Sequence, residues 1–114
     1  MMFGFDETIE FNSSPQVKLK KSLDEMLKLL DKPVKNDQRF FDEFSSLFNN
    51  ARAIYCTLTP TEQSSISLYW SAIDSTLQQM PMMINAGALM GTSMVVNFIP
   101  ALKNHCLQAI ALLS

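Results

Sequence analysis

Apolar side chains recur three or four residues apart along most of the chain, and this spacing constrains the fold more than any other feature. Such a period places the apolar residues on one side of an α-helix. Phe41, Phe48 and Tyr55, each seven residues apart, widen the clearest stripe into a face. That stripe, with steps of 4, 3, 4, 3 and 4 residues, consists of Phe40, Phe44, Leu47, Ala51, Ile54 and Leu58.

Capping signals mark the first two helices. Ser13-Ser14-Pro15 combines an N-cap residue with a proline at the first helical position, and it predicts a helix start. This helix continues to about Asp31, because Lys32-Pro33 disfavours helical backbone. Asn36 or Asp37 caps the second helix. The apolar positions of the first helix are Leu19, Leu23, Met26 and Leu30.

The third helix begins with the strongest signal in the chain. Thr59-Pro60-Thr61-Glu62 is a capping box, in which the Thr59 hydroxyl and the Glu62 carboxylate each accept a backbone N–H bond. The junction with the second helix is very short, so the two helices turn back on each other. Pro81 is expected to close the third helix. Its apolar positions are Ile66, Tyr69, Trp70, Ile73, Leu77 and Met80.

The remaining chain predicts two further helices, one over 82–96 and one after Asn97. Asn97 would cap the last helix; the alternative is one long helix that kinks near Pro100. The fold class is therefore all-α. We expect a small bundle of four to five helices over residues 13–114, preceded by an extended N-terminal arm over residues 1–12.

The arm follows a different period. Its apolar residues Phe3, Phe5, Ile9 and Phe11 alternate with polar residues or glycine, apart from Glu7. Period two indicates an extended, strand-like segment with one apolar face. Exposed rings would promote aggregation. We therefore expect the arm either to lie in a groove of its own bundle or to pair with a second copy in a homodimer.

Composition limits the function classes. A chain of 114 residues makes one domain, and a net charge of −2 with a pI near 5.2 argues against nucleic-acid binding, which requires a basic face. The first residues lack the basic and long apolar runs of a signal peptide. We expect a cytoplasmic protein, although export by a specialised secretion system would leave the same pattern.

Charge is distributed very unevenly. Residues 1–52 hold nine acidic and eight basic side chains, whereas residues 53–114 hold only Glu62, Asp74 and Lys103. No charge occurs between Ser75 and Leu102. Three interpretations of the helix predicted over 82–96 remain open: it is wrapped by the other helices, its outer side is an interface with another chain, or it spans a membrane.

Two features bear on the membrane interpretation. The Gly87 to Gly91 spacing is a small-xxx-small pattern, which occurs between membrane helices but also lets neighbouring helices of a soluble bundle approach closely. Asn85, Thr92, Ser93 and Asn97 interrupt the apolar run, and flanking Lys or Arg anchors are missing. These interruptions argue against a span.

Methionine is concentrated in the same region. Five of the eight methionines lie there, and unbranched, polarizable side chains suit a surface that adapts to a partner. Filling of the core is the alternative role. The candidate partner-binding residues are Phe3, Phe5, Ile9 and Phe11 of the arm and Met80, Met82, Met83, Met90 and Met94.

The sequence holds no recognisable catalytic, cofactor or metal motif. His105 and Cys106 are adjacent, so on a helix they point about 100° apart and cannot form a catalytic pair with each other. One histidine and two cysteines fall short of a structural zinc site. We therefore expect no enzyme, no cofactor and no metal.

The leading functional hypothesis is a protein-binding module that regulates, inhibits or chaperones another protein. It would act through the uncharged, methionine-rich half and the phenylalanine-rich arm. A structural subunit that assembles with copies of itself is the alternative. An enzyme that uses Cys56 or Cys106 is a third hypothesis. A homodimer is expected in which the arm and the two C-terminal helices supply the contacts.

Overall fold

The computed structural model describes residues 14–113, so the arm predicted over residues 1–12 lies outside the described part. The described chain forms four α-helices, and no strand occurs within it. A short 3-10 helix precedes the last of them. The elements are α2 (Pro15–Leu30), α3 (Asp37–Tyr55), α4 (Pro60–Met90), η1 (Val95–Phe98) and α5 (Ile99–Leu113).

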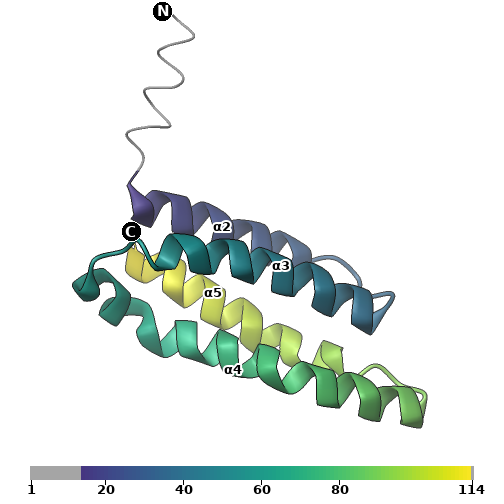
Figure 1. The fold of residues 1–114 in the computed structure, drawn as a ribbon. Helices are drawn as coiled ribbons and strands as arrows, with labels where there is room; N and C mark the ends of the chain where they lie inside the picture. Colours follow the sequence, from purple (N-terminus) through teal and green to yellow (C-terminus); the bar gives the residue numbers. More distant parts are fainter. Residues whose placement is uncertain (1–13, 114) are drawn as a thin grey trace, which may run out of the picture.

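The four helices form an antiparallel bundle in which consecutive helices alternate in direction (Figure 1). α2 packs against α3 and α5, and α4 packs against the same two helices. The bundle therefore has an α2–α3 layer and an α4–α5 layer. The all-α bundle expected from the sequence is confirmed.

Polar caps begin the first two helices, as predicted. The Ser14 hydroxyl accepts a hydrogen bond from the Val17 amide at 3.2 Å. For the second helix the cap is Asn36 rather than Asp37, because the Asn36 side-chain oxygen accepts from the Arg39 amide at 2.9 Å. Each cap satisfies a backbone donor that the helix itself leaves without a partner.

The capping box of α4 is also confirmed. The Glu62 amide donates to the Thr59 hydroxyl at 3.2 Å, and the Thr59 amide donates to the Glu62 carboxylate at 2.9 Å. The Gln63 side chain then donates to the carbonyls of Tyr55 and Leu58. These bonds join the end of α3 to the start of α4 and fix the short antiparallel turn.

The predicted end of the third helix at Pro81 is wrong, because α4 continues through Pro81 to Met90. A proline inside a helix removes one backbone hydrogen bond and is unfavourable on its own. Pro81 is exposed, however, while Leu77, Met80 and Gly87 on either side of it are buried. Packing of this continuous inner face therefore outweighs the local preference of proline.

The helix expected after Asn97 is confirmed as α5. The separate helix expected over 82–96 is wrong, and so is the alternative of one long helix kinked at Pro100. Residues 82–90 belong to α4, and Val95–Phe98 form η1. Pro100 lies in the first turn of α5, where its missing N–H costs no helical bond.

Two glycines form the end of α4. Gly91 has a φ of 70°, the left-handed conformation that glycine adopts without strain. The Thr92 amide donates to the Gly87 carbonyl at 2.9 Å and the Gly91 amide to the Ala88 carbonyl at 3.4 Å, which is a Schellman ending. A Cβ on Gly87 would lie 2.5 Å from the Thr92 carbonyl oxygen. The small-xxx-small pattern thus serves a tight turn rather than close packing of two helices.

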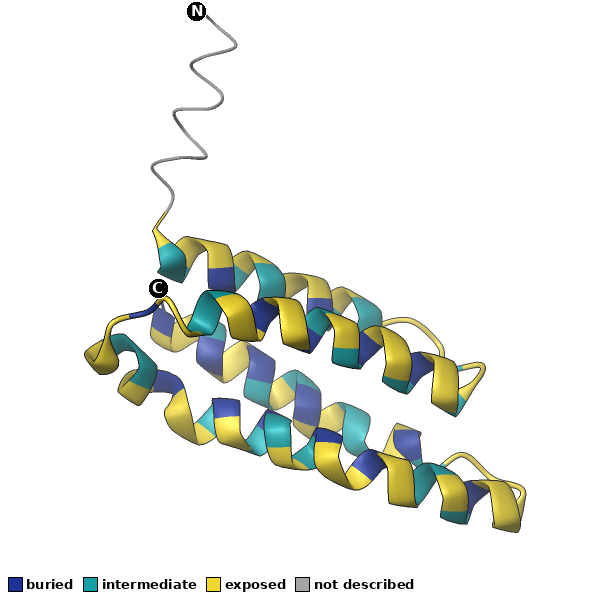
Figure 2. Ribbon diagram, viewed as in Figure 1, coloured by how far each residue is buried: buried dark blue, intermediate teal, exposed yellow. Residues whose placement is uncertain are grey.

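The core lies between the two layers and draws on every helix (Figure 2). Its aromatic part joins α3 to α4, because the Trp70 ring stacks on Phe48 at 4.6 Å and on Tyr55 at 4.4 Å between centroids. The largest fully buried side chains are Phe44, Phe48, Leu19, Leu23, Met26, Ile66, Ile73, Met80, Leu102, Val95 and Cys106.

Candidate protein-interaction surface

The two layers of the bundle differ sharply in charge. α2, α3 and the turn between them hold fourteen charged side chains: Lys18, Lys20, Lys21, Asp24, Glu25, Lys28, Asp31, Lys32, Lys35, Asp37, Arg39, Asp42, Glu43 and Arg52. The described residues after α3 hold only Glu62, Asp74 and Lys103. The position of those three side chains decides whether any charge reaches the outer side of the α4–α5 layer.

The Asp74 side chain lies where α3 and α4 pack against each other. Its carboxylate accepts a hydrogen bond from the Arg52 guanidinium at 3.0 Å, and the same carboxylate accepts from the Gln78 amide at 3.2 Å. The guanidinium also lies over the Phe48 ring, 5.1 Å from its centroid. This charge on α4 is therefore turned toward the charged layer and neutralised there.

The other two charges are also directed away from the outer surface of the α4–α5 layer. Lys103 of α5 forms an ion pair with Asp31 at the end of α2, at 2.9 Å. Glu62 is held in the capping box with Thr59 at the start of α4. Apart from Asp74 and Lys103, which pair with residues of the α2–α3 layer, α4 and α5 carry no charge between residues 63 and 113.

We call this surface the uncharged face and define it by ten exposed residues: Leu68, Ser71, Ser75, Gln79, Met82, Leu89, Met90, Leu107, Gln108 and Leu112. Leu68, Met82 and Leu89 lie at multiples of seven residues and share one side of α4. Their exposed fractions are 73%, 72% and 90%. A surface helix of a monomer normally shows charge on its outer side, and these ten residues show none.

Of the three interpretations of residues 82–96, the first is contradicted. Met82, Leu89 and Met90 are exposed, so the segment is not wrapped by the other helices. None of the helices described is long and apolar enough to cross a membrane. Exposure of these side chains is compatible with the interface interpretation.

The structure separates the predicted partner-binding methionines. Met82 and Met90 are exposed on α4, whereas Met83 and Met94 are half-buried. Met80 is fully buried and belongs to the core. The arm residues Phe3, Phe5, Ile9 and Phe11 lie outside the described residues.

Sequence reasoning missed the leucines of this face. Leu68, Leu89, Leu107 and Leu112 are exposed, although leucine in an amphipathic pattern usually faces the core. The seven-residue spacing of Leu68, Met82 and Leu89 was a signal for a second apolar stripe on α4. This stripe lies outside the buried one that contains Ile66, Ile73 and Met80.

The side chains that could take part in catalysis lie elsewhere and are not assembled into a site. Burial raises the pKa of the Cys106 thiol to about 12, which keeps it protonated at neutral pH. Cys56 is exposed beyond the end of α3. The ring of His105 lies 6.3 Å from that of Tyr69, and its Nδ1 is buried without a hydrogen-bond partner. Among the described residues no group of three or more His, Cys, Asp or Glu side chains is placed to bind a metal ion.

Comparisons with known proteins found no match, whether among protein-family models, curated proteins or solved structures. The function is therefore argued from the surface itself.

Proposed function

We propose that this protein is a non-catalytic module that binds another protein through the uncharged face, and that it regulates, inhibits or chaperones that partner. The observation that carries the proposal is the orientation of the charges. Asp74, Lys103 and Glu62 are held at seams or in a cap, so a broad two-helix surface is left with exposed leucine and methionine among neutral polar residues.

Such a surface suits a protein partner for a physical reason. Burying a charge in an interface costs desolvation energy that is recovered only with a well-placed opposite charge. The centres of protein interfaces are accordingly poor in charge and rich in apolar side chains, including methionine. The flexible side chains of Met82 and Met90 add the ability to fit an irregular partner surface.

Self-assembly is the second candidate, and the same face favours it. A two-fold interface brings identical surfaces together, so a charged face would meet its own like charges. The uncharged face avoids this repulsion. We therefore propose a homodimer through α4 and α5 as the alternative to a different partner protein.

Co-purification from the host tests the leading proposal and uses two single substitutions. Leu89→Lys places a charge on the uncharged face. The control, Val17→Lys, places a charge on α2 instead, at an apolar side chain that is 52% exposed. We expect one stoichiometric partner with the wild type and with Val17→Lys, and loss of that partner with Leu89→Lys. A partner that is retained by Leu89→Lys would contradict the proposal.

Light scattering of the purified wild-type protein distinguishes the two candidates. A dimer that dissociates in Leu89→Lys but not in Val17→Lys supports self-assembly through the same face. A monomer at every concentration, together with no captured partner, would reject both candidates.

A further inference from the structure

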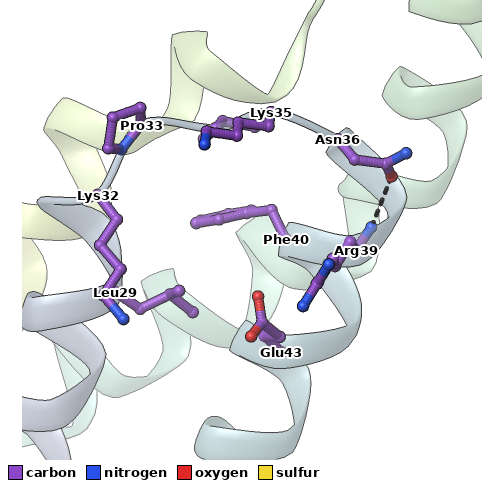
Figure 3. Close-up of a pocket in the computed structure, with 9 residues that line it drawn as sticks. Leu29, Lys32, Pro33, Lys35, Asn36, Arg39, Phe40 and Glu43 are labelled. Carbon is purple, nitrogen blue, oxygen red and sulfur yellow. Dashed lines mark hydrogen bonds between the residues drawn. The ribbon is translucent and has the colours of Figure 1, made fainter.

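A pocket lies between the end of α2 and the start of α3, in the charged layer of the bundle. Its volume is about 350 Å³. Figure 3 shows the Phe40 ring in the middle of the pocket, with Lys32, Lys35 and Arg39 around it. We call it the α2–α3 pocket; its lining residues are Leu29, Lys32, Pro33, Val34, Lys35, Asn36, Arg39, Phe40 and Glu43.

The three cations of the pocket have no ion-pair partner among the described residues. Lys28, one turn earlier on α2, shows the ordinary alternative, because it pairs with Asp24 at 3.5 Å. Lys32, Lys35 and Arg39 make no such contact within residues 14–113. Three positive charges thus converge on one pocket in a protein whose net charge is −2.

Three of the four nearby acids have an ion-pair or hydrogen-bond partner outside the pocket. Asp31 pairs with Lys103 of α5 at 2.9 Å. Asp37 accepts a hydrogen bond from the Ser93 hydroxyl at 2.7 Å, in the turn after α4. Asp42 accepts from the Gln38 amide at 3.0 Å. Glu43 is the single acidic residue that lines the pocket.

The pocket also has apolar walls. Leu29 and Val34 are half-buried, and the Phe40 ring stacks on Phe44 with 5.7 Å between the centroids, which fixes it in place. An apolar side chain can therefore contact Leu29 and Val34, beside the buried Phe40 ring, while an acidic neighbour reaches the cations. This volume is at the small end of ligand pockets and suits one or two side chains.

We propose that the α2–α3 pocket binds a short acidic peptide segment of a partner protein, in which an apolar side chain is flanked by carboxylates. The apolar side chain contacts Leu29 and Val34 beside the buried Phe40 ring, and the carboxylates accept hydrogen bonds from Lys32, Lys35 and Arg39. The pocket belongs to α2 and α3 and shares no residue with the uncharged face. The proposal is therefore independent of the function proposed for that face.

A titration of the full-length, ¹⁵N-labelled protein tests this site. The probe is the peptide acetyl-Glu-Leu-Glu-amide, and the matched control is acetyl-Gln-Leu-Gln-amide, which has the same shape without charge. We expect saturable amide shifts centred on residues 32–43 with the acidic peptide, and much weaker binding of the neutral one.

Variants separate pocket binding from general charge attraction. Lys35→Gln combined with Arg39→Gln should weaken binding about tenfold, as two partly exposed charged contacts would. Glu43→Gln should strengthen it about twofold, because a like charge is removed. Lys21→Gln, at an exposed position of α2 outside the pocket, should leave it unchanged.

Equal binding of the neutral peptide would overturn the proposal. Unchanged binding by the Lys35/Arg39 double variant would do so as well, and so would the absence of saturable shifts at residues 32–43. Inorganic phosphate that binds as tightly as the acidic peptide would also overturn it, since the site would then hold an anion only. Amide spectra of the variants without peptide confirm that each is folded.

Discussion

Gly87 and Gly91 are two glycines with different physical roles in one turn. Gly91 needs its left-handed conformation but has open space around it, because a Cβ there would meet nothing within 4 Å. Gly87 has ordinary helical backbone but no room, since its Cβ would press on the Thr92 carbonyl. One position is constrained by conformation and the other by packing.

Both glycines are predicted to resist substitution by alanine. Gly91→Ala should lower the free energy of unfolding by about 1–2 kcal/mol through left-handed strain. Gly87→Ala should lower it by about 1–3 kcal/mol, because the backbone of the turn has to shift. Urea denaturation measures both. A stabilised Gly87→Ala, which helix propensity alone would predict, would contradict the tight turn described for residues 87–94.

Because the thiol of Cys106 is buried, the free energy of unfolding should depend on pH in the alkaline range. Burial raises its pKa from 9.0 to about 12 in the folded protein, while the unfolded chain keeps the ordinary value. The unfolded state therefore releases its proton first, and this contribution to stability is complete below pH 9 and decreases as the pH rises toward 12. Denaturation of wild type and Cys106→Ala between pH 8 and 11 measures it. Identical slopes for the two proteins would contradict this account of Cys106.

At the scale of the elements, α4 shows packing overriding a local signal. Pro81 lies inside a 31-residue helix and is exposed. The buried face on either side of it is formed by Leu77, Met80 and Gly87. The helix therefore tolerates the loss of one hydrogen bond because both flanking segments are held in the core.

This account predicts that Pro81→Ala stabilises the protein. Alanine restores the backbone N–H and is up to about 3 kcal/mol more favourable than proline inside a helix. The gain should be about 1–2 kcal/mol, because alanine also makes the unfolded chain more flexible. Thermal unfolding followed by circular dichroism measures it. A destabilised variant would contradict it.

The elements that the sequence predicted share one property: their signals are local. Ser14, Asn36 and the Thr59–Glu62 box each act within three residues, so their effect is visible in the sequence. The path of α4 through Pro81 depends on the buried face of a whole bundle, which no local pattern contains. Leu68 and Leu89 were missed for a different reason. Their spacing on α4 was visible in the sequence, but leucine in a helical pattern usually faces the core.

At the scale of the molecule, the main feature is the division of the bundle into a charge-rich α2–α3 layer and an α4–α5 layer that holds only Glu62, Asp74 and Lys103. The sequence showed the uneven distribution of charge along the chain. The structure adds the direction of the three remaining charges, since Asp74 and Lys103 pair across the seams with Arg52 and Asp31. These exposed ion pairs contribute little to stability. Their consequence is a broad surface that another chain can cover without burying a charge.

Site-specific photo-crosslinking in the host cell tests the central claim most directly. A photoreactive phenylalanine analogue is placed at Leu89 in one variant and at Val17 in the other. Both residues are exposed and apolar, but only Leu89 lies on the uncharged face. The account predicts a discrete crosslinked species, to a partner or to a second copy, from position 89 and none from position 17. Crosslinking from position 17 alone, or from neither position, would contradict it.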